Sequence, residues 1–310
     1  MTRIGLRKAA RLVGAVVVLI AAGLWFLAEP RMIDADGLPD HIADPEYGRL
    51  VFHEAGCNSC HAAPGAKGEE KLVLAGGLGL KTPFGTFYAP NISTDLVDGI
   101  GGWSDLEFVN AVMRGVSPDG SHYYPAFPYL SYQRMTIEDV LDLKAYMDTL
   151  PAIGGVAPSH DLLAPLRLRR GIGLWKLAFM DDAPFVPPLG ADEQIARGAY
   201  LVNGPGHCGE CHTPRNLFGA PDQERAFSGG PAPEGAKNVP NITPSEDGIG
   251  GWSERDITAA LRTGLLPGFE TFGGLMVPVQ ENMAALTDAD REAIAAYLLS
   301  LPPKPSWWKQ

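Results

Sequence analysis

The sequence predicts an all-α protein made of two tandem copies of one helical domain, placed behind an N-terminal transmembrane anchor. Three observations lead to this prediction. A Cys-x-x-Cys-His motif occurs twice, the segments around it repeat at offsets of 149 to 151 residues, and no run of alternating apolar and polar residues indicates a strand. The chain has 310 residues and a formal net charge of −11, which argues against a nucleic-acid partner.

The first 30 residues predict a signal anchor. Basic residues up to Arg11 precede an uncharged apolar run from Leu12 to Ala28, whose 17 residues are at the short limit for a helix that crosses a membrane. The upstream positive charges predict a cytoplasmic N-terminus, which places the rest of the chain outside the cytoplasm. A cleaved signal peptide and a buried helix of a soluble domain are the alternatives.

The repeat sets the expected domain boundaries. Four landmarks keep their order in both copies: Cys57–His61 and Cys208–His212, Pro90–Ile92 and Pro240–Ile242, Asp98–Ser104 and Asp247–Ser253, and Thr136–Pro151 and Thr287–Pro302. Each copy is long enough to be a complete domain. The predicted divisions are an anchor at 1–30, a first domain at 31–153, a linker at 154–190, a second domain at 191–304 and a tail at 305–310.

Each copy contains the same predicted helices. One helix leads into each cysteine motif, over residues 44–55 and 192–202. Ser104 and Ser253 begin sequences that resemble capping boxes and open a shorter helix in each copy, and a threonine begins the last helix. The Pro- and Gly-rich linker is expected to hold a short helix packed across the two domains, with a membrane-surface or partner-docking role as the alternative.

The Cys-x-x-Cys-His motifs predict two covalently attached haem c groups. In such a motif both thiols add to the vinyl groups of the porphyrin and the histidine ligates the iron. A zinc site and a redox dithiol are the alternatives, but the two cysteine pairs lie in separate domains and no βαβ pattern accompanies them. The predicted site residues are the thioether cysteines Cys57, Cys60, Cys208 and Cys211 and the proximal ligands His61 and His212.

The sixth iron ligand distinguishes an electron carrier from a site that binds small molecules. Met276, in the loop before the last helix, is the predicted distal ligand of the second haem, with a gap-filling core residue as the alternative. Phe127 stands at the corresponding place in the first copy and cannot ligate iron. Met135 is the predicted substitute there, and His122 or an open or water-ligated iron are the alternatives.

Two prolines that follow the cysteine motifs predict how the proximal histidines are held. A ligating histidine usually donates its second ring N–H to a carbonyl or carboxylate, and the carbonyls of Pro90 and Pro240 are the predicted acceptors. A plain turn is the alternative role for both prolines. Asn91 and Asn241, one residue further on, are candidates to approach the haem edges or propionates.

These motifs, together with the segment YYPAFPY at residues 123–129, resemble the multihaem cytochrome c subunits of bacterial membrane-bound dehydrogenases that oxidise alcohols, gluconate or aldehydes. The resemblance covers residues 44–303. It implies tandem class I cytochrome c domains in the periplasm that take electrons from a dehydrogenase subunit and pass them to ubiquinone or another cytochrome. Those subunits typically carry three haems and the sequence PAMPY, whereas this chain has two motifs and Phe127 in place of that methionine.

The expected function is therefore that of a dihaem cytochrome c anchored in the bacterial inner membrane. It would relay single electrons from a dehydrogenase catalytic subunit to a quinone or to another cytochrome or oxidase, without catalytic activity of its own. The alternative is a dihaem enzyme, peroxidase-like or oxidising sulfur compounds, that uses the first haem as an open catalytic site.

Overall fold

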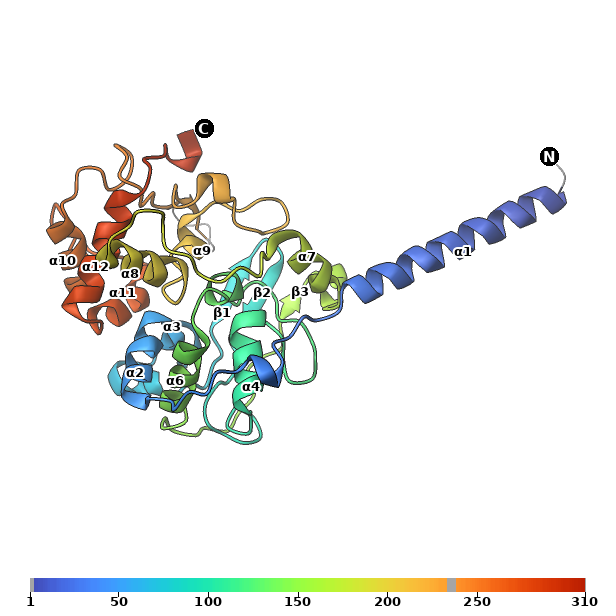
Figure 1. The fold of residues 1–310 in the computed structure, drawn as a ribbon, viewed down its shortest axis with the longest axis horizontal. Helices are drawn as coiled ribbons and strands as arrows, with labels where there is room; N and C mark the ends of the chain where they lie inside the picture. Colours follow the sequence, from blue (N-terminus) through green and yellow to red (C-terminus); the bar gives the residue numbers. More distant parts are fainter. Residues whose placement is uncertain (1–2, 233–237, 310) are drawn as a thin grey trace.

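The computed structural model describes residues 3–232 and 238–309, and for residues 3–10 it describes the backbone alone. Residues 1 and 2 of the expected anchor and residue 310 of the expected tail lie outside this range. Two helical units pack side by side, and the N-terminal helix α1 (Arg3–Leu27) projects away from both (Figure 1). The repeat in the sequence is therefore a repeat of structural units.

In the first unit, the helix that leads into the cysteine motif crosses the last helix at a glycine. The elements are α2 (Pro45–Glu54), α3 (Cys57–His61), α4 (Asp105–Val109), a π-helix (Asn110–Arg114), α5 (Tyr129–Tyr132) and α6 (Ile137–Met147). A Cβ atom at Gly48 on α2 would stand 1.9 Å from the carbonyl oxygen of Asp142 on α6. The two helices can approach this closely only because Gly48 has no side chain.

The second unit repeats this crossing. Its helices are α8 (Glu193–Asn203), α9 (Gly209–His212), α10 (Glu254–Thr263), α11 (Met276–Ala284) and α12 (Asp288–Ser300). A Cβ atom at Gly198 on α8 would stand 1.9 Å from the carbonyl oxygen of Ala293 on α12. Each unit thus places its cysteine motif at the end of a helix that is tightly packed against the last helix.

The predicted helix starts are confirmed. The Ser104 hydroxyl accepts a hydrogen bond from the backbone N–H of Glu107, and the Ser253 hydroxyl accepts one from Asp256, so both capping boxes are formed. The last helices begin in the same way, because Thr136 and Thr287 each accept a hydrogen bond from the backbone N–H three residues further on.

The expectation of an all-α fold is wrong, because the chain also contains short strands. They are β1 (Gly79–Thr82), β2 (Gly85–Tyr88), β3 (Asp161–Leu162), β4 (Gly230–Pro231) and β5 (Asn238–Val239). The first three form an antiparallel sheet in the order β1-β2-β3, and β4 pairs with β5. Two residues connect β1 to β2, and the β-favouring residues Thr86 to Tyr88 follow Gly85, whose φ of +122° suits glycine.

The linker contains the short helix that was expected, α7 (Gly171–Phe179), and this helix contacts both units. The Lys176 ammonium donates hydrogen bonds to the carbonyls of Arg114 and Gly115 in the first unit, at 2.6 and 2.8 Å. The Trp175 indole N–H donates to the carbonyl of Phe218 in the second unit, at 2.8 Å. The linker therefore fastens the two units together rather than leaving them free to separate.

The expectation of a transmembrane anchor at residues 1–30 is also wrong. Across the described ranges, no helix reaches the combination of length and apolar character that a membrane crossing requires. The physical reason lies in α1, whose uncharged run of 17 residues is shorter than the roughly 20 residues typical of a spanning helix. The expected placement in the inner membrane, with a cytoplasmic N-terminus and periplasmic haem domains, depended on this anchor and is therefore not supported either.

Candidate haem-binding sites

The two cysteine motifs form the short helices α3 and α9, each entered through a residue with positive φ. In the first unit this residue is Gly56, at φ +60°, and in the second it is His207, at φ +40°. None of the four cysteines forms a disulfide, and burial raises the pKa of Cys57 to about 12 and that of Cys60 to about 11. The thiols are therefore protonated at neutral pH and are not bonded to one another.

The proximal histidines are held by the contacts that the sequence predicts. The Nδ1–H of His61 donates to the carbonyl of Pro90 at 2.9 Å, and the Nδ1–H of His212 donates to the carbonyl of Pro240 at 2.8 Å. This hydrogen bond sets the orientation of each ring and leaves Nε2 free to ligate iron. Burial lowers the pKa of both imidazoles, which favours the neutral form that binds a metal.

Asparagine side chains fix the backbone that carries these carbonyl acceptors. Asn91 donates to the carbonyls of Ile153 and Gly155 at 2.7 and 3.0 Å, and Asn241 donates to the carbonyl of Lys304 at 2.8 Å. Each asparagine thus ties the segment after its proline to the chain that follows the last helix of the unit. These contacts give Asn91 and Asn241 a structural role, and their expected approach to the haem edges stays a prediction.

A pair of repeated glycines, which the sequence analysis did not single out, brings the acceptor segment close to each motif. Gly76 and Gly229 both have positive φ, and their N–H groups donate to the carbonyls of His61 and His212 at 2.7 and 2.9 Å. A Cβ atom at Gly76 would stand 2.5 Å from the backbone of Pro90. The repeated Gly-Gly pairs at 76–77 and 229–230 were the available sequence signal.

Met276, the predicted distal ligand of the second haem, is the first residue of α11 and is partly exposed. It comes two residues after Gly274, and its neighbours Leu275 and Val277 are exposed, at 37 and 40%. Met276 does not belong to the buried core cluster of the second unit, so its thioether is not used for packing there. The assignment of Met276 as distal ligand stays a prediction.

In the first unit, Phe127 stands at the corresponding sequence position and lies in an aromatic cluster. The ring of Phe127 packs against those of Tyr123, Tyr129 and Tyr132, with centroid distances of 6.0, 6.5 and 5.6 Å. The substitute ligand expected from the sequence, Met135, is only 4% exposed and belongs to the hydrophobic core of the unit. The structure therefore does not bring Met135 out of the core, and its role as a ligand remains untested.

The two attachment segments face each other across an interface between the units, which we call the seam. Asn282 on α11 donates to Asn58 Oδ1 and Ser59 Oγ at 2.6 and 2.9 Å, and Ser131 on α5 donates to Glu210 Oε1 at 3.1 Å. The thiol of Cys211 adds to the rise in the pKa of Cys60, so the two motifs are close enough to interact electrostatically.

Two histidines to which the sequence analysis gave no role also lie in the seam. The Nδ1–H of His53 donates to Asn282 Oδ1 at 2.8 Å. The ring of His207 packs edge to face on Tyr132, with centroids 5.5 Å apart, and His207 hydrogen-bonds the backbone of Ala55. Their contacts are long-range, so no local pattern could indicate them.

A buried ionic cluster continues the seam beside the first motif. Arg197 on α8 pairs with Glu54 on α2, and its Nε donates to Asp290 Oδ1 at 2.8 Å. Glu54 is 1% exposed, and this burial raises its pKa to about 7 although the Arg197 guanidinium acts in the opposite direction. Next to it, the Tyr200 hydroxyl donates to the carboxylate of Asp139.

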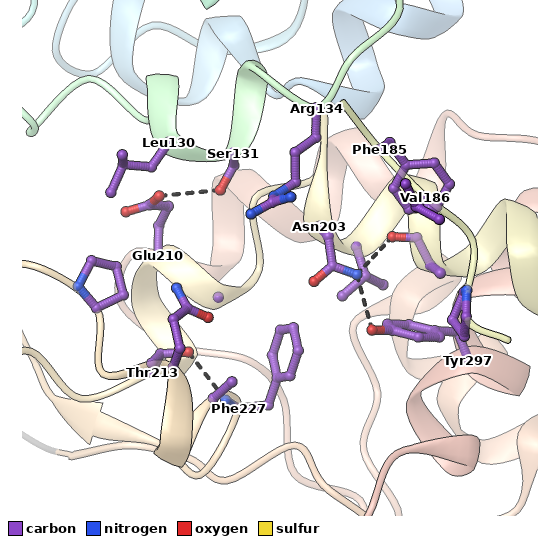
Figure 2. A pocket seen from close by; sticks show the side chains of 17 residues that line it. Leu130, Ser131, Arg134, Phe185, Val186, Asn203, Glu210, Thr213, Phe227 and Tyr297 are labelled. Atoms are coloured by element: carbon purple, nitrogen blue, oxygen red, sulfur yellow. Dashed lines mark hydrogen bonds between the residues drawn. The ribbon is translucent and has the colours of Figure 1, made fainter. Parts of the chain in front are cut away.

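A cavity of about 290 Å³ opens where the seam meets α9 (Figure 2). The Ser131–Glu210 hydrogen bond lies at its edge, and Asn203, which donates to the Tyr297 hydroxyl at 2.9 Å, lines it from the second unit. The volume has room for several water molecules and polar groups to bind them.

The residues of both motifs fit a covalently bound haem. Each motif offers two unpaired thiols and a neutral imidazole whose Nε2 is free, which is the donor set of haem c attachment. The zinc alternative lacks support, since the described part of the chain holds no group of three or more His, Cys, Asp or Glu side chains placed to bind a metal ion. The redox-dithiol alternative lacks its βαβ setting, because the described strands pair antiparallel.

Comparison with known proteins gives the same assignment. A family model described as cytochrome c matches residues 195–302. A diheme cytochrome c-type protein of Cereibacter sphaeroides is 47% identical over 291 residues, which are 93% of this chain and 97% of that protein. The cytochrome c subunit of an alcohol dehydrogenase (quinone) from Komagataeibacter europaeus is 41% identical over 271 residues, and a fructose dehydrogenase cytochrome subunit from Gluconobacter japonicus is 35% identical over 290 residues.

The chain spans little more than half the length of these two dehydrogenase subunits, 56% and 58%, but 84% and 93% of the chain is matched. The resemblance stated from the motifs is thereby confirmed. Covalent haem c and electron transfer follow from membership of this group. The chain belongs to the c-type cytochromes, in the family that includes a diheme cytochrome c and the cytochrome subunits of alcohol, fructose and gluconate dehydrogenases.

Proposed function

We propose that this cytochrome carries two haems and passes single electrons from a dehydrogenase to a further acceptor, either a quinone or another cytochrome or oxidase. The proposed attachment residues are Cys57, Cys60 and His61 in the first unit and Cys208, Cys211 and His212 in the second, with Met276 as distal ligand of the second haem. When bound, haem supplies a one-electron iron couple.

The observation that carries the proposal is the position of α3 and α9 on the two sides of one hydrogen-bonded seam. Asn282 reaches Asn58 and Ser59 beside the first pair of cysteines, and Ser131 reaches Glu210 between the second pair. These bonds anchor each attachment segment to a helix of the other unit, α3 to α11 and α9 to α5, and so hold the two segments at a fixed separation. A fixed separation is what electron transfer between two centres requires.

The chain's own residues then have defined tasks. The carbonyls of Pro90 and Pro240 hold the proximal imidazoles in one orientation, so the iron ligands need little rearrangement when an electron arrives. The linker helix α7 keeps the units together through Trp175 and Lys176. The net charge of −11 favours docking partners that present a basic surface.

The haem count is tested with two matched double variants. Replacing Cys57 and Cys60 by alanine removes one attachment site, and replacing Cys208 and Cys211 by alanine removes the other. Each variant should contain half of the haem of the unmodified protein, measured as pyridine haemochrome per chain. A full haem content in either double variant would contradict the assignment.

The partner is tested by purifying the tagged full-length chain from its own cells under mild conditions and identifying by mass spectrometry what co-purifies with the haem-stained band. A stoichiometric dehydrogenase should be found, and its substrate should reduce the haems in the purified complex. Haems that stay oxidised when every co-purified protein is supplied with its substrate would overturn the electron-relay proposal.

A further inference from the structure

The two units differ at the sequence position expected to supply the distal ligand. Met276 and Phe127 stand twelve residues after Gly264 and Gly115, the glycines that follow α10 and the π-helix. Met276 has a thioether that can ligate iron, whereas Phe127 has no donor atom. The first unit must therefore either recruit a ligand from another position or leave the sixth position of its haem without a side chain.

Phe127 belongs to an aromatic cluster that adjoins the first attachment segment. Its ring packs on Tyr132, and the Tyr132 hydroxyl donates to the carbonyl of Ala55 at 2.8 Å, two residues before Cys57. Phe127 and Cys57 both pack against the same hydrophobic core. The cluster thus brings apolar ring surface to the attachment segment, and none of its four residues (Tyr123, Phe127, Tyr129 and Tyr132) is a usual ligand of haem c.

Met135 is a core residue of the repeat rather than a distal ligand. It directly precedes the helix cap Thr136, and Leu286 directly precedes the corresponding cap, Thr287, in the second unit. Met135 and Leu286 are both 4% exposed, and each lies in the core cluster of its own unit. Since the second unit uses a leucine at this position, the position serves packing in both units.

The other candidate donors in the first unit are buried away from solvent. His122 is 3% exposed, and its Nε2 lies 2.9 Å from the carbonyl oxygen of Ala28, just beyond the end of α1. A backbone bridge to Val116 fixes the position of this histidine. Met113 lies inside the π-helix and is 7% exposed within the core cluster.

We infer that the first haem has no protein ligand at its sixth position and forms a binding site for small neutral molecules of the size of carbon monoxide. The inference rests on the haem attachment at Cys57, Cys60 and His61 proposed above, and it adds a ligand-binding site to the electron relay. The aromatic side chains around Phe127 give the site apolar walls without charged groups, which suits a small neutral ligand.

The test is a titration of the reduced full-length protein with carbon monoxide, followed by the Soret difference spectrum, with the haem count determined in parallel. The unmodified protein should bind one carbon monoxide per two haems. Met276→Leu should bind two. Phe127→Met should bind none and should gain intensity in the near-infrared sulfur-to-iron charge-transfer band of the oxidised form. Met135→Leu, which installs the residue of the second unit, should leave both spectra unchanged.

The outcomes separate this inference from the function on which it rests. Two haems that are both six-coordinate and bind no carbon monoxide would overturn the inference and leave the electron relay intact. Carbon monoxide binding that appears only in Met135→Leu would identify Met135 as the ligand and also overturn it. A chain with fewer than two haems would instead overturn the proposed haem assignment itself.

Discussion

The two units share their framework and differ where they meet the haem and each other. Both units cross two helices at a glycine, cap the last helix with threonine and direct a histidine N–H to a proline carbonyl. They differ at Phe127 and Met276, and at the residue before the first cysteine of each motif. The two copies thus share the contacts that support the fold and differ in residues around the two haem-attachment sites.

The residue before the first cysteine illustrates the second difference. Gly56 takes a φ of +60° without strain, but His207 takes a φ of +40°, which costs a residue with a Cβ atom about 1 kcal/mol or more. The imidazole of His207 packs on Tyr132 of the other unit, and the residue hydrogen-bonds Ala55. The strained backbone conformation of His207 in the second motif is therefore accompanied by contacts of the same residue with the first unit.

The largest change is expected from Met276→Leu, which removes the difference in distal residue between the units. Loss of a thioether ligand should lower the midpoint potential of the second haem by on the order of a few tenths of a volt, because methionine ligation raises the potential. Potentiometric titration measures this. Met283→Leu, in the core beside it, is the control and should leave both potentials in place. Unchanged potentials in Met276→Leu would show that this thioether is not a ligand.

The next largest effect is a pH dependence of the free energy of unfolding that arises in the first unit. Only this unit carries a buried acid three residues before its first cysteine. Glu54 stands there, and Pro205 stands at the corresponding place. The folded pKa of Glu54, about 7, lies above its ordinary value of 4.5, so the folded state binds more protons between these pH values. The free energy of unfolding should therefore fall, by on the order of 3 kcal/mol, as the pH rises from 4.5 to 7.

Denaturant unfolding across this pH range tests the point. Glu54→Gln should flatten the profile, whereas Glu46→Gln, on the exposed surface of the same helix, should keep it. A Glu54→Gln profile as steep as that of the unmodified protein would assign the dependence to another group.

Smaller and unequal losses are expected when Asn282 and Ser131, two hydrogen-bonding residues of the seam, are replaced. Asn282→Ala leaves the buried Asn58 without its partner and should lower the free energy of unfolding by about 2 kcal/mol. Ser131→Ala removes one bond to Glu210, which also pairs with Arg215, and should cost about 1 kcal/mol or less. Thermal unfolding of both variants measures the difference, and equal losses would contradict this asymmetry of the seam.

The smallest effect should be the same in both units. Ser104→Ala and Ser253→Ala each remove one capping box and should each lower the free energy of unfolding by about 1 kcal/mol. Ser104→Asp and Ser253→Asp, which retain a capping oxygen, are the matched controls. A loss of stability confined to one unit would mean that the capping box does not stabilise the two copies equally.

Local patterns predicted much of the sites and part of the fold. The cysteine motifs, the capping serines and the proline carbonyls are signals within a few residues of the groups they organise, and the structure places these groups as expected. The β1–β2 hairpin was missed because its strands are only four residues long, too short for an alternating pattern to stand out. The anchor was predicted from apolar character in a run that is short of a full span.

Contacts between distant residues could not be predicted. Gly48 and Gly198 serve as crossing points because of carbonyls about 95 residues further along the chain, and nothing beside them in the sequence indicates this. The same holds for Glu54, which reads as an ordinary helical acid until Arg197 approaches it from the other unit. Likewise, the burial of Met135 at the position that Leu286 holds in the second unit becomes visible only when the two folded units are compared.

The hydrogen bonds of the seam also have a two-fold arrangement that indicates how the chain arose. Ser131 is hydrogen-bonded to Glu210, and Ser59 is hydrogen-bonded to Asn282. Ser131 and Asn282 are 151 residues apart, and so are Ser59 and Glu210, which is the offset that separates the cysteine motifs. The same patch of each copy therefore contacts the other copy, as in an isologous dimer with two-fold symmetry. A single-haem ancestor with this patch could pair with itself before duplication joined the copies. Because a two-fold contact closes on itself, any further domain in the longer relatives has to attach through a different face.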